Sequence, residues 1–488
     1  MIDFRSLLIV LPEIGVLAFA LIMLLAAAAC GSRVTRHIGI FAIIGFAIAG
    51  GVMLCPWRLS ELFNGALPVF AFGKFFVEDS FIRFVKLVIL VVSSLSIILS
   101  WDYFEKEDDE KPEYPVLVMF ATLGMMLMVS AADLLTLYMG LEMQSLSLYV
   151  LAAIRRDDMR SSEAGLKYFV LGALSSGIFL YGASLLYGFA GTTDMVSLAY
   201  SLRDQAATHP GIVIGMVFVC AALTFKVAGV PFHMWAPDVY EGAPTPVTAF
   251  FATAPKIAAL AVLARFLFQP MFGLTEQWHQ IVAFVAVASM LWGAFAGIAQ
   301  GNIKRMLAYS SISNVGYMLT GFMVGGNVGL QSVLIYVVIY AVGVMGTFAA
   351  LLCLRRDGAE IEKIEDLAGL SQISPGVSFA LSLFMFSLAG IPPLAGFFGK
   401  YFVFLAAVNA GLLPLAIIGV LSSVVAAYYY LRVVKVMYFD DVARALDNDA
   451  GFGVRATVFV TSVAVVCLTF VPSYLVEEAL SAAKGFIV

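Results

Sequence analysis

The sequence predicts an all-α polytopic membrane protein with about fourteen transmembrane helices. Composition is the first observation behind this prediction: 62% of the 488 residues are hydrophobic and 12% are charged, whereas about a quarter of residues are charged in soluble domains. The second is that the apolar residues form separate runs, each near the length that crosses a bilayer. The third is a pair of similar interruptions, at 228–231 and 389–392, which predict helices that break inside the membrane.

Short polar links separate the apolar runs, so neighbouring spans are expected to be antiparallel. The first run is longer than the apolar core of a signal peptide and is expected to be a retained span. The seventh and twelfth runs are long, and proline and glycine interrupt them. The expected spans are residues 7–29, 37–55, 80–101, 114–131, 132–153, 164–189, 211–240, 244–267, 279–300, 303–324, 328–354, 375–407, 411–438 and 454–475.

Basic residues are unevenly shared between the loops of the two sides. By the positive-inside rule, the richer loops lie in the cytoplasm. Combined with an even number of spans, this assignment predicts that both termini lie on the outer side. The loops assigned to the cytoplasm contain Arg33, Arg36, Lys106, Lys111, Arg155, Arg156, Arg160, Lys304, Arg305, Arg355, Arg356, Lys363, Arg432, Lys435, Arg444 and Arg455.

Four ionisable residues lie near the centres of expected spans, where a charge costs several kcal/mol unless it faces protein or water. They are Glu142 in the fifth span, Lys226 in the seventh, Lys256 in the eighth and Lys400 in the twelfth. A proline-rich break at 231–246 lies between the first two lysines. A structural pair of Glu142 with one lysine would leave two lysines unexplained. Buried charges beside broken helices therefore predict a path for a small cation.

Lysines in series suit the transfer of protons. An ordinary lysine, with a pKa of about 10.4, holds its proton too tightly to relay it near neutral pH. Burial lowers the pKa of a lysine, and a nearby carboxylate raises it again. We therefore expect Lys226, Lys256 and Lys400 to be relay sites bridged by water, with Glu142 controlling the proton affinity of Lys226.

The tenth expected span has a polar face that is a candidate for holding this water. Hydrogen bonds between helices are an equally open interpretation of the same residues. The polar residues are Tyr309, Ser310, Ser311, Ser313, Asn314 and Tyr317.

Two other lysines, Lys86 and Lys167, lie within about two turns of a span end, and their side chains are expected to reach the membrane surface. The 5 cysteines and 4 histidines have no metal-binding or iron–sulfur spacing. No glycine-rich nucleotide motif follows a strand pattern. The sequence therefore predicts no cofactor or metal in this chain.

An internal repeat links the two interrupted spans. Ala228-Gly229-Val230-Pro231 in the seventh matches Ala389-Gly390-Ile391-Pro392 in the twelfth, and five spans separate them, so the two units have opposite orientations. Inverted repeats with broken helices are typical of secondary transporters. The expected organisation is a three-helix segment at 1–113, a five-helix repeat at 114–267, an inverted repeat at 279–438 and a C-terminal helix at 439–488.

Three long motifs resemble one family of membrane proteins. PFHMWAPDVYEGAPTPVTAFFATAPK at 231–256 and NIKRMLAYSSISNVGYM at 302–318 are similar to the antiporter-like subunits of respiratory complex I, the proton-pumping NADH:quinone oxidoreductase. AGIPPLAGFFGKYFVF at 389–404 resembles the N-subunit branch, the counterpart of mitochondrial subunit 2, which has a lysine where the M and L branches have a glutamate and an aspartate. The resemblance covers nearly the whole chain.

This resemblance implies a proton-translocating subunit of a bacterial inner membrane, in which the charge bias of the loops predicts that both termini are periplasmic. It assigns the proton relay to Glu142, Lys226, Lys256 and Lys400, all of which match the family pattern. It also implies that NADH, FMN, the iron–sulfur clusters and quinone bind to partner subunits. The expected partners are the M subunit and the small multi-spanning subunits of the same membrane arm, within the lipid bilayer and without nucleic acid.

Two alternatives remain open from the residues. One is a subunit of a related multi-subunit cation/proton antiporter, and the other is a membrane scaffold that has lost pumping. The motif around Lys400 favours the N-subunit branch over the first, and the complete set of buried charges argues against the second.

Overall fold

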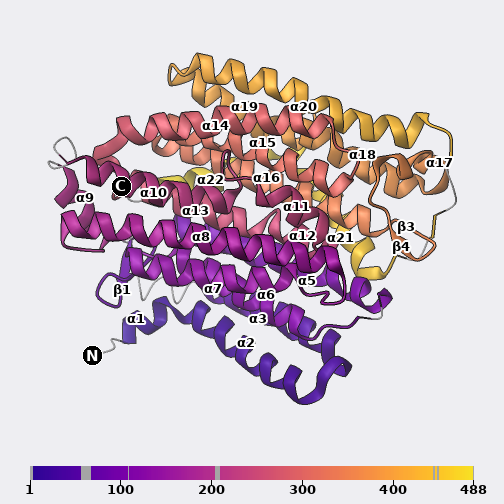
Figure 1. Ribbon diagram of the computed structural model, residues 1–488, viewed down its shortest axis with the longest axis horizontal. Helices are drawn as coiled ribbons and strands as arrows, with labels where there is room; N and C mark the ends of the chain where they lie inside the picture. The colour runs from indigo at the N-terminus through magenta and orange to yellow at the C-terminus, as the bar shows by residue number, and fades with distance from the viewer. Residues whose placement is uncertain are drawn as a thin grey trace.

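The computed structural model describes residues 4–55, 68–107, 109–203, 209–442, 446–447 and 450–486. Within these residues the chain is almost wholly helical, with two short antiparallel hairpins. Long helices run side by side across the molecule (Figure 1). The rings of Phe81, at the start of α5 (Ser80–Lys106), and Phe486 are 4.9 Å apart, so the last described residues return to the end of the bundle that also holds α1 (Phe4–Ile9). The expected all-α fold is confirmed.

The N-terminal segment consists of three long helices and a hairpin. The hairpin pairs Val69 with Glu78, and Asp79 then caps α5 by accepting a hydrogen bond from the Ile82 amide. The other elements of this segment are α2 (Leu11–Cys30), η1 (Gly31–Val34), α3 (Thr35–Leu54), β1 (Val69–Ala71) and β2 (Phe76–Glu78).

Two groups of helices follow, and each contains a span interrupted at a proline-containing motif. The first group comprises α6 (Glu113–Val129), α7 (Leu134–Ala152), α8 (Met159–Ala190), α9 (Met195–Arg203), α10 (Pro210–Val227), α11 (Trp235–Gly242), α12 (Thr245–Phe251) and α13 (Ala254–Phe268). The second comprises η2 (Phe272–Leu274), α14 (Thr275–Ile298), α15 (Ile303–Val324), α16 (Gly326–Leu352), α18 (Pro375–Ala389), α19 (Ala395–Asn409) and α20 (Leu413–Phe439).

The remaining elements close the bundle. The hairpin of β3 and β4 and the short α17 lie at the opposite end from α9 (Figure 1). The remaining elements are β3 (Arg355–Arg356), β4 (Ala359–Glu360), η3 (Ile364–Leu367), α17 (Leu370–Ile373), α21 (Phe452–Phe470) and α22 (Pro472–Lys484).

The expected number of spans agrees with the described helices. By length and composition, 11 helical stretches are apolar enough to cross a membrane. The shorter α6, the broken pair α18–α19 and α15 supply the others. The helix α15 is not in the apolar set because its polar face lowers its hydropathy, but nearly all of its residues are buried. A helix enclosed by protein does not need a lipid-compatible surface.

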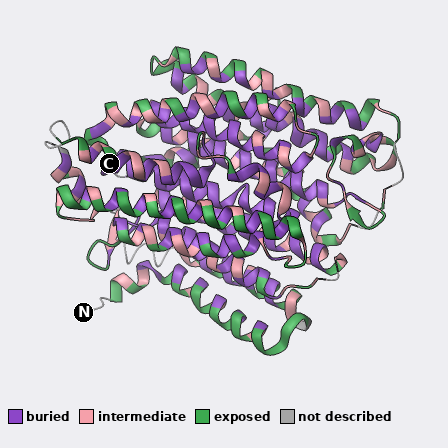
Figure 2. Ribbon diagram, in the orientation of Figure 1, coloured by how far each residue is buried: buried purple, intermediate pink, exposed green. Residues whose placement is uncertain are grey.

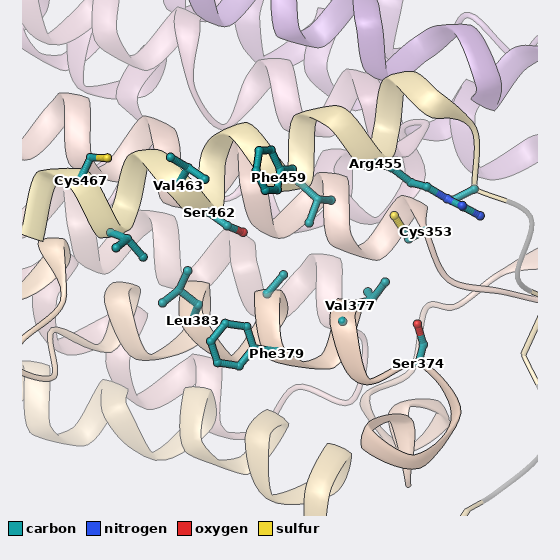
Figure 3. Close-up of a pocket in the computed structure, with 15 residues that line it drawn as sticks. Cys353, Ser374, Val377, Phe379, Leu383, Arg455, Phe459, Ser462, Val463 and Cys467 are labelled. Atoms are coloured by element: carbon teal, nitrogen blue, oxygen red, sulfur yellow. The ribbon is translucent and has the colours of Figure 1, made fainter.

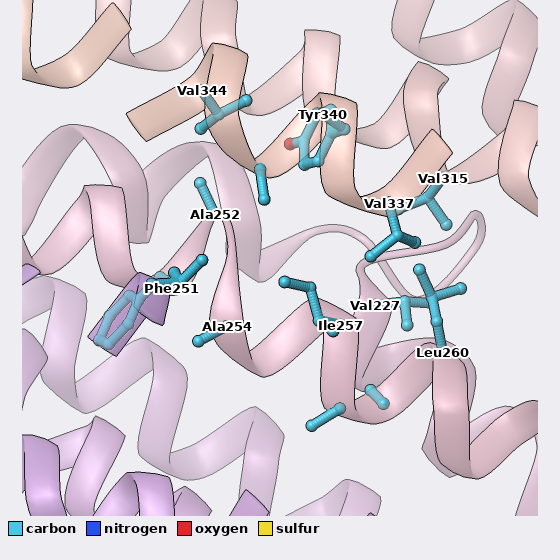
Figure 4. Packing of buried hydrophobic residues seen from close by; sticks show 14 of the residues in the cluster. Val227, Phe251, Ala252, Ala254, Ile257, Leu260, Val315, Val337, Tyr340 and Val344 are labelled. Carbon is cyan, nitrogen blue, oxygen red and sulfur yellow. The ribbon is translucent and has the colours of Figure 1, made fainter. Parts of the chain in front are cut away.

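Burial increases toward the centre of the bundle (Figure 2). In α12–α13 the whole apolar window is buried, and in α16 89% of it, against 28% in α2 and in α21. Phe251, Ile257 and Leu260 pack beside Val337 and other residues of α16 (Figure 4). The broken segment that carries Lys256 is therefore the centre of the protein.

Two expected spans differ from the structure. The expected span 244–267 is broken between Phe251 and Ala254, because Pro255 has no amide hydrogen and its ring would clash with the carbonyl four residues earlier, that of Phe251. The expected span 7–29 is likewise divided, since α1 ends at Ile9 and Pro12 lies in the first turn of α2. The interruptions expected in the seventh and twelfth spans are confirmed.

Candidate functional site

Lys226 lies in the last turn of α10, where the helix ends on Ala228 in the left-handed conformation (φ 60°). Its side chain is 3% exposed. The ammonium donates to Ser145 Oγ at 2.6 Å and to Tyr149 Oη at 3.5 Å, both on α7. The lysine therefore sits at a helix break and is held by two neutral hydroxyl groups.

Glu142 is one turn before Ser145 on α7, so the two residues share a helix face. Its side chain is half-buried, and Oε1 is enclosed without a hydrogen-bond partner. In the described part of the chain Glu142 forms no salt bridge with Lys226, whose contacts on α7 are with Ser145 and Tyr149. Control of the Lys226 charge by Glu142 thus remains a prediction. Sequence reasoning missed Ser145, although its three-residue spacing from Glu142 was a signal.

Lys256 lies in the first turn of α13, immediately after the break at Ala252–Thr253, and is 2% exposed. Its ammonium donates to Ser311 Oγ on α15. Tyr340 Oη on α16 donates to the same Ser311 oxygen at 2.6 Å. The ring of Tyr240 lies 5.4 Å from Lys256 Nζ, an attractive distance for a cation.

Lys400 lies in the second turn of α19 and is 6% exposed. Its ammonium donates to the Ala389 carbonyl at 2.8 Å, at the end of α18, and to Ser423 Oγ at 2.7 Å. A Cβ atom on Gly390 (φ +83°) would lie 2.8 Å from Lys400 Cδ. Glycine at this position therefore permits both the left-handed turn and the close approach of the lysine to free backbone.

The three lysines share one electrostatic arrangement. In the part of the chain that the structure describes, none of them forms a salt bridge with a carboxylate. Each is bound by hydroxyl or carbonyl oxygens, which stabilise an ammonium group less strongly than a carboxylate does. Such surroundings favour a group that can both hold and lose a proton.

The polar face of α15 connects Lys256 with Lys400. Next to Ser311, the Ser310 hydroxyl is hydrogen-bonded to Tyr430, and Asn314 accepts from Tyr336 Oη at 2.6 Å. One turn further, Tyr317 Oη accepts from Ser422 Oγ at 3.4 Å, and its ring lies 5.1 Å from Lys400 Nζ. The expected polar face of α15 is therefore present in the structure, and its side chains form hydrogen bonds with neighbouring helices.

Aromatic side chains lie between Lys226 and Lys256. Tyr149, which contacts Lys226, meets the ring of Tyr168 at 4.9 Å, and Tyr168 stacks on Trp235 at 4.4 Å. Trp235 in turn approaches Tyr240 at 6.4 Å. Among the described residues the buried Tyr240 hydroxyl has no hydrogen-bond partner, and an ordered water would satisfy it.

The position of Lys86 near a span end predicted that its side chain reaches the membrane surface, but the structure shows it buried. Its side chain is 0% exposed, and its ammonium lies 2.6 Å from Glu13 Oε1 and 2.9 Å from Glu78 Oε2. The prediction was wrong because two other elements, the distant α2 and the nearby strand β2, bring carboxylates to the lysine. Two carboxylates keep an ammonium charged, so Lys86 differs from the three lysines at helix breaks.

Lys167 is 41% exposed, as expected for a lysine near a span end. It forms salt bridges with Glu163 on its own helix and with Asp238 on α11. Asp238 also binds Arg305 at 2.7 Å, which ties α8 and α15 to the broken seventh span. Within the described residues no group of three His, Cys, Asp or Glu side chains could hold a metal.

Comparisons with known proteins agree with this geometry. Residues 131–426 match the family described as NADH:quinone oxidoreductase/Mrp antiporter, TM. NADH-quinone oxidoreductase subunit N of Rhodospirillum rubrum is 49% identical over 99% of this chain and 98% of its own length. A chain of respiratory complex I from Thermus thermophilus, solved with bound aureothin, superposes with a TM-score of 0.80 at 31% identity, covering 96% of this chain and 99% of that one.

A second solved structure shows how widely the fold is shared. A chain of the Mrp complex from Dietzia sp. superposes with a TM-score of 0.84 at 21% identity, covering 99% of this chain and 97% of that one. This likeness concerns the fold alone. The identity and coverage of the first relative are decisive, and the chain belongs to the family of subunit N of NADH-quinone oxidoreductase.

Proposed function

We propose that this chain translocates protons across the membrane as the N subunit of a NADH-quinone oxidoreductase, driven by quinone reduction elsewhere in the complex. The main support is the shared setting of Lys226, Lys256 and Lys400. Each is buried beside a helix break and held by neutral oxygens. A purely structural subunit has no need of three lysines buried in the membrane, each of which costs several kcal/mol of free energy.

The proposed relay begins at α7. A proton on Lys226 is stabilised when the Glu142 carboxylate is charged, and is released when a change in the partner subunits weakens that interaction. Ser145 and Tyr149 fix the ammonium in place during this cycle. The pair therefore loads and unloads the first lysine.

Transfer to Lys256 requires water, because the side chains between the two lysines are mainly aromatic. The unpartnered Tyr240 hydroxyl and Ser311 are the groups that would bind this water. From Lys256 the polar face of α15 provides hydroxyl and amide groups as far as Tyr317. Lys400 is then the terminal acceptor of this chain.

The proposal includes the expected position of the chain in its complex. Both termini lie on the periplasmic side, and the two five-helix repeats at 114–267 and 279–438 form the transport unit between the N-terminal segment 1–113 and the C-terminal helix at 439–488. NADH, FMN, iron–sulfur clusters and quinone bind to other subunits. The M subunit and small multi-spanning subunits are the neighbours.

Purification of the native assembly tests this function. A tag on this chain should isolate a complex that oxidises NADH, and in sealed vesicles NADH should drive proton uptake without added sodium. The fold shared with an Mrp chain makes sodium/proton antiport the alternative. An isolated assembly that exchanges sodium for protons and does not oxidise NADH would overturn the proposal in favour of that alternative.

A further inference from the structure

A groove on the outer surface of the bundle lies between α18 and α21, away from the lysine relay. It has a volume of about 570 Å³, within the ~300–1,000 Å³ usual for ligand sites. Its walls are mostly apolar, and Phe379 of α18 and Phe459 of α21 point into it (Figure 3). Both phenylalanines are largely exposed. The groove therefore faces whatever surrounds the protein.

The two ends of the groove differ in charge. Arg455 and Ser374 lie at one end, and Cys467 lies at the other (Figure 3). Arg455 is the one charged side chain among the described residues that line the groove. The helices α18 and α21 both begin at the arginine end, so the positive ends of two helix dipoles add to its charge.

Two polar groups at the groove lack partners. In the first turn of α18 the amide of Gly376 has no acceptor within the described residues, and a Cβ at Gly376 would meet open space. Halfway along the groove, the buried Ser462 hydroxyl has no hydrogen-bond partner in the described part of the chain, and Figure 3 shows it directed toward the groove. At the arginine end, the Gly376 amide is therefore a hydrogen-bond donor that an anion can bind.

The length of the groove fits one leaflet of a bilayer. From Arg455 to Cys467 the helix rises roughly 18 Å, and half of the hydrocarbon core of a bilayer is about 15 Å thick. Arg455 lies in the first turn of α21, at the end of the span that the positive-inside rule assigns to the cytoplasm. Anionic lipids concentrate on that side, and basic residues attract them. A groove with a cationic end at the membrane surface and an apolar body of this length matches the shape of a phospholipid.

We propose that this groove is a binding site for an anionic glycerophospholipid. The phosphate lies beside Arg455 at the first turns of α18 and α21, and one acyl chain packs against Phe379, Phe459 and Val463. This inference is independent of the proton relay and of the identity of the redox partners.

Photolabelling of the whole assembled complex tests the site. The complex is reconstituted with phosphatidylglycerol that carries a photoreactive acyl chain, and labelled peptides are identified by mass spectrometry. We expect labels on the segment 459–467, suppressed by excess unlabelled phosphatidylglycerol and much less by phosphatidylcholine. Equal suppression by the two lipids would contradict the requirement for an anion.

Matched variants locate the lipid in the groove. Val463→Trp fills the groove, whereas Val460→Trp places the same bulk on the same helix outside its lining. Val463→Trp should abolish labelling of 459–467, and Val460→Trp should leave it. Equal labelling of the two variants would overturn the proposal. If Val463→Trp fails to assemble, the competition experiment on the unaltered complex still decides the question.

A charge variant tests the headgroup contact. Arg455→Gln should lower phosphatidylglycerol labelling about fivefold, which corresponds to the ~1 kcal/mol that a basic residue contributes near a membrane surface. The control is Lys435→Gln, an exposed lysine on α20 that pairs with Asp440. Unchanged labelling in Arg455→Gln would contradict the account. A second test places a photoreactive residue at position 463. A crosslink from it to a partner subunit would also contradict the account, since the groove would then be a protein interface.

Discussion

Replacement of Lys400 by arginine separates a proton relay from a fixed counter-ion. Lys400→Arg keeps a positive charge between α18 and α20 but raises the ordinary pKa of the group by about 3 units, so proton release to the same acceptor is roughly a thousandfold less favourable. That difference corresponds to about 4 kcal/mol. A relay should fail with arginine, whereas a fixed counter-ion should not.

The surroundings of Lys400 add a geometric cost. The lysine has two described acceptors, the Ala389 carbonyl and Ser423 Oγ, but a guanidinium has five donors. Each buried donor left without a partner costs about 1–3 kcal/mol. We therefore expect Lys400→Arg to be at best partly active, with proton pumping at least tenfold below that of the unaltered complex.

The assay is NADH-driven acidification of sealed vesicles that contain the purified complex, followed with a pH-sensitive dye and normalised to assembled complex. Lys435→Arg is the control, because Lys435 is 61% exposed and pairs with Asp440. It should retain full activity. A fully active Lys400→Arg complex would refute the role of Lys400 as a relay site and identify it as a structural cation.

The remaining predictions concern Glu142, Lys86 and the chain ends. Glu142→Gln keeps the shape of the side chain and removes its charge, so proton pumping and coupled quinone reduction should fall in complex that still assembles; full pumping would exclude Glu142 from the relay. Lys86→Met leaves two carboxylates buried without their cation, which should destabilise the fold by about 3–5 kcal/mol. The amount of assembled complex on native gels should therefore fall, and a normal amount would mean that Lys86 is dispensable. A reporter active only in the cytoplasm, fused after Val488, should be silent, and activity there would reverse the proposed orientation.

The sequence predicted the fold well because the bilayer imposes strong rules on composition and helix length. It also located Lys226, Lys256 and Lys400, since a lysine in an apolar run is conspicuous. Their place beside helix breaks was predicted for the seventh and twelfth spans from proline and glycine. The break before Lys256 was missed, because Pro255 is a single proline with no glycine beside it, unlike the motifs of the seventh and twelfth spans.

Long-range contacts account for what the sequence left unknown. Glu13 is far from Lys86 in the chain, and Glu78 lies in the hairpin before α5, so no helix spacing shows that either meets the lysine. The same reason explains why Ser145 and Ser423 were not recognised as lysine partners. Serine is common in membrane helices as a packing residue, and only the fold identifies which serines face an ammonium group.

The left-handed residues also refine the internal repeat. The four-residue match aligns Ala228 with Ala389, but the residue that ends α18 in the left-handed conformation is Gly390. The helix ends therefore correspond one residue out of step with the sequence match. Lys226 precedes its break and Lys400 follows its own, so the two lysines lie at opposite helix ends, and Lys400 bonds a free carbonyl there.

The central claim is that protons pass through the buried lysines of this chain, and Lys256 tests it most directly because it occupies the centre of the bundle. Lys256→Met keeps a linear side chain and removes the proton-binding group. The measurement is the initial rate of NADH-driven proton translocation by the purified, reconstituted complex, with Lys435→Met as the control. The account predicts at least a tenfold loss for Lys256→Met at normal assembly and full activity for the control. Proton translocation by Lys256→Met at the rate of the unaltered complex would contradict it.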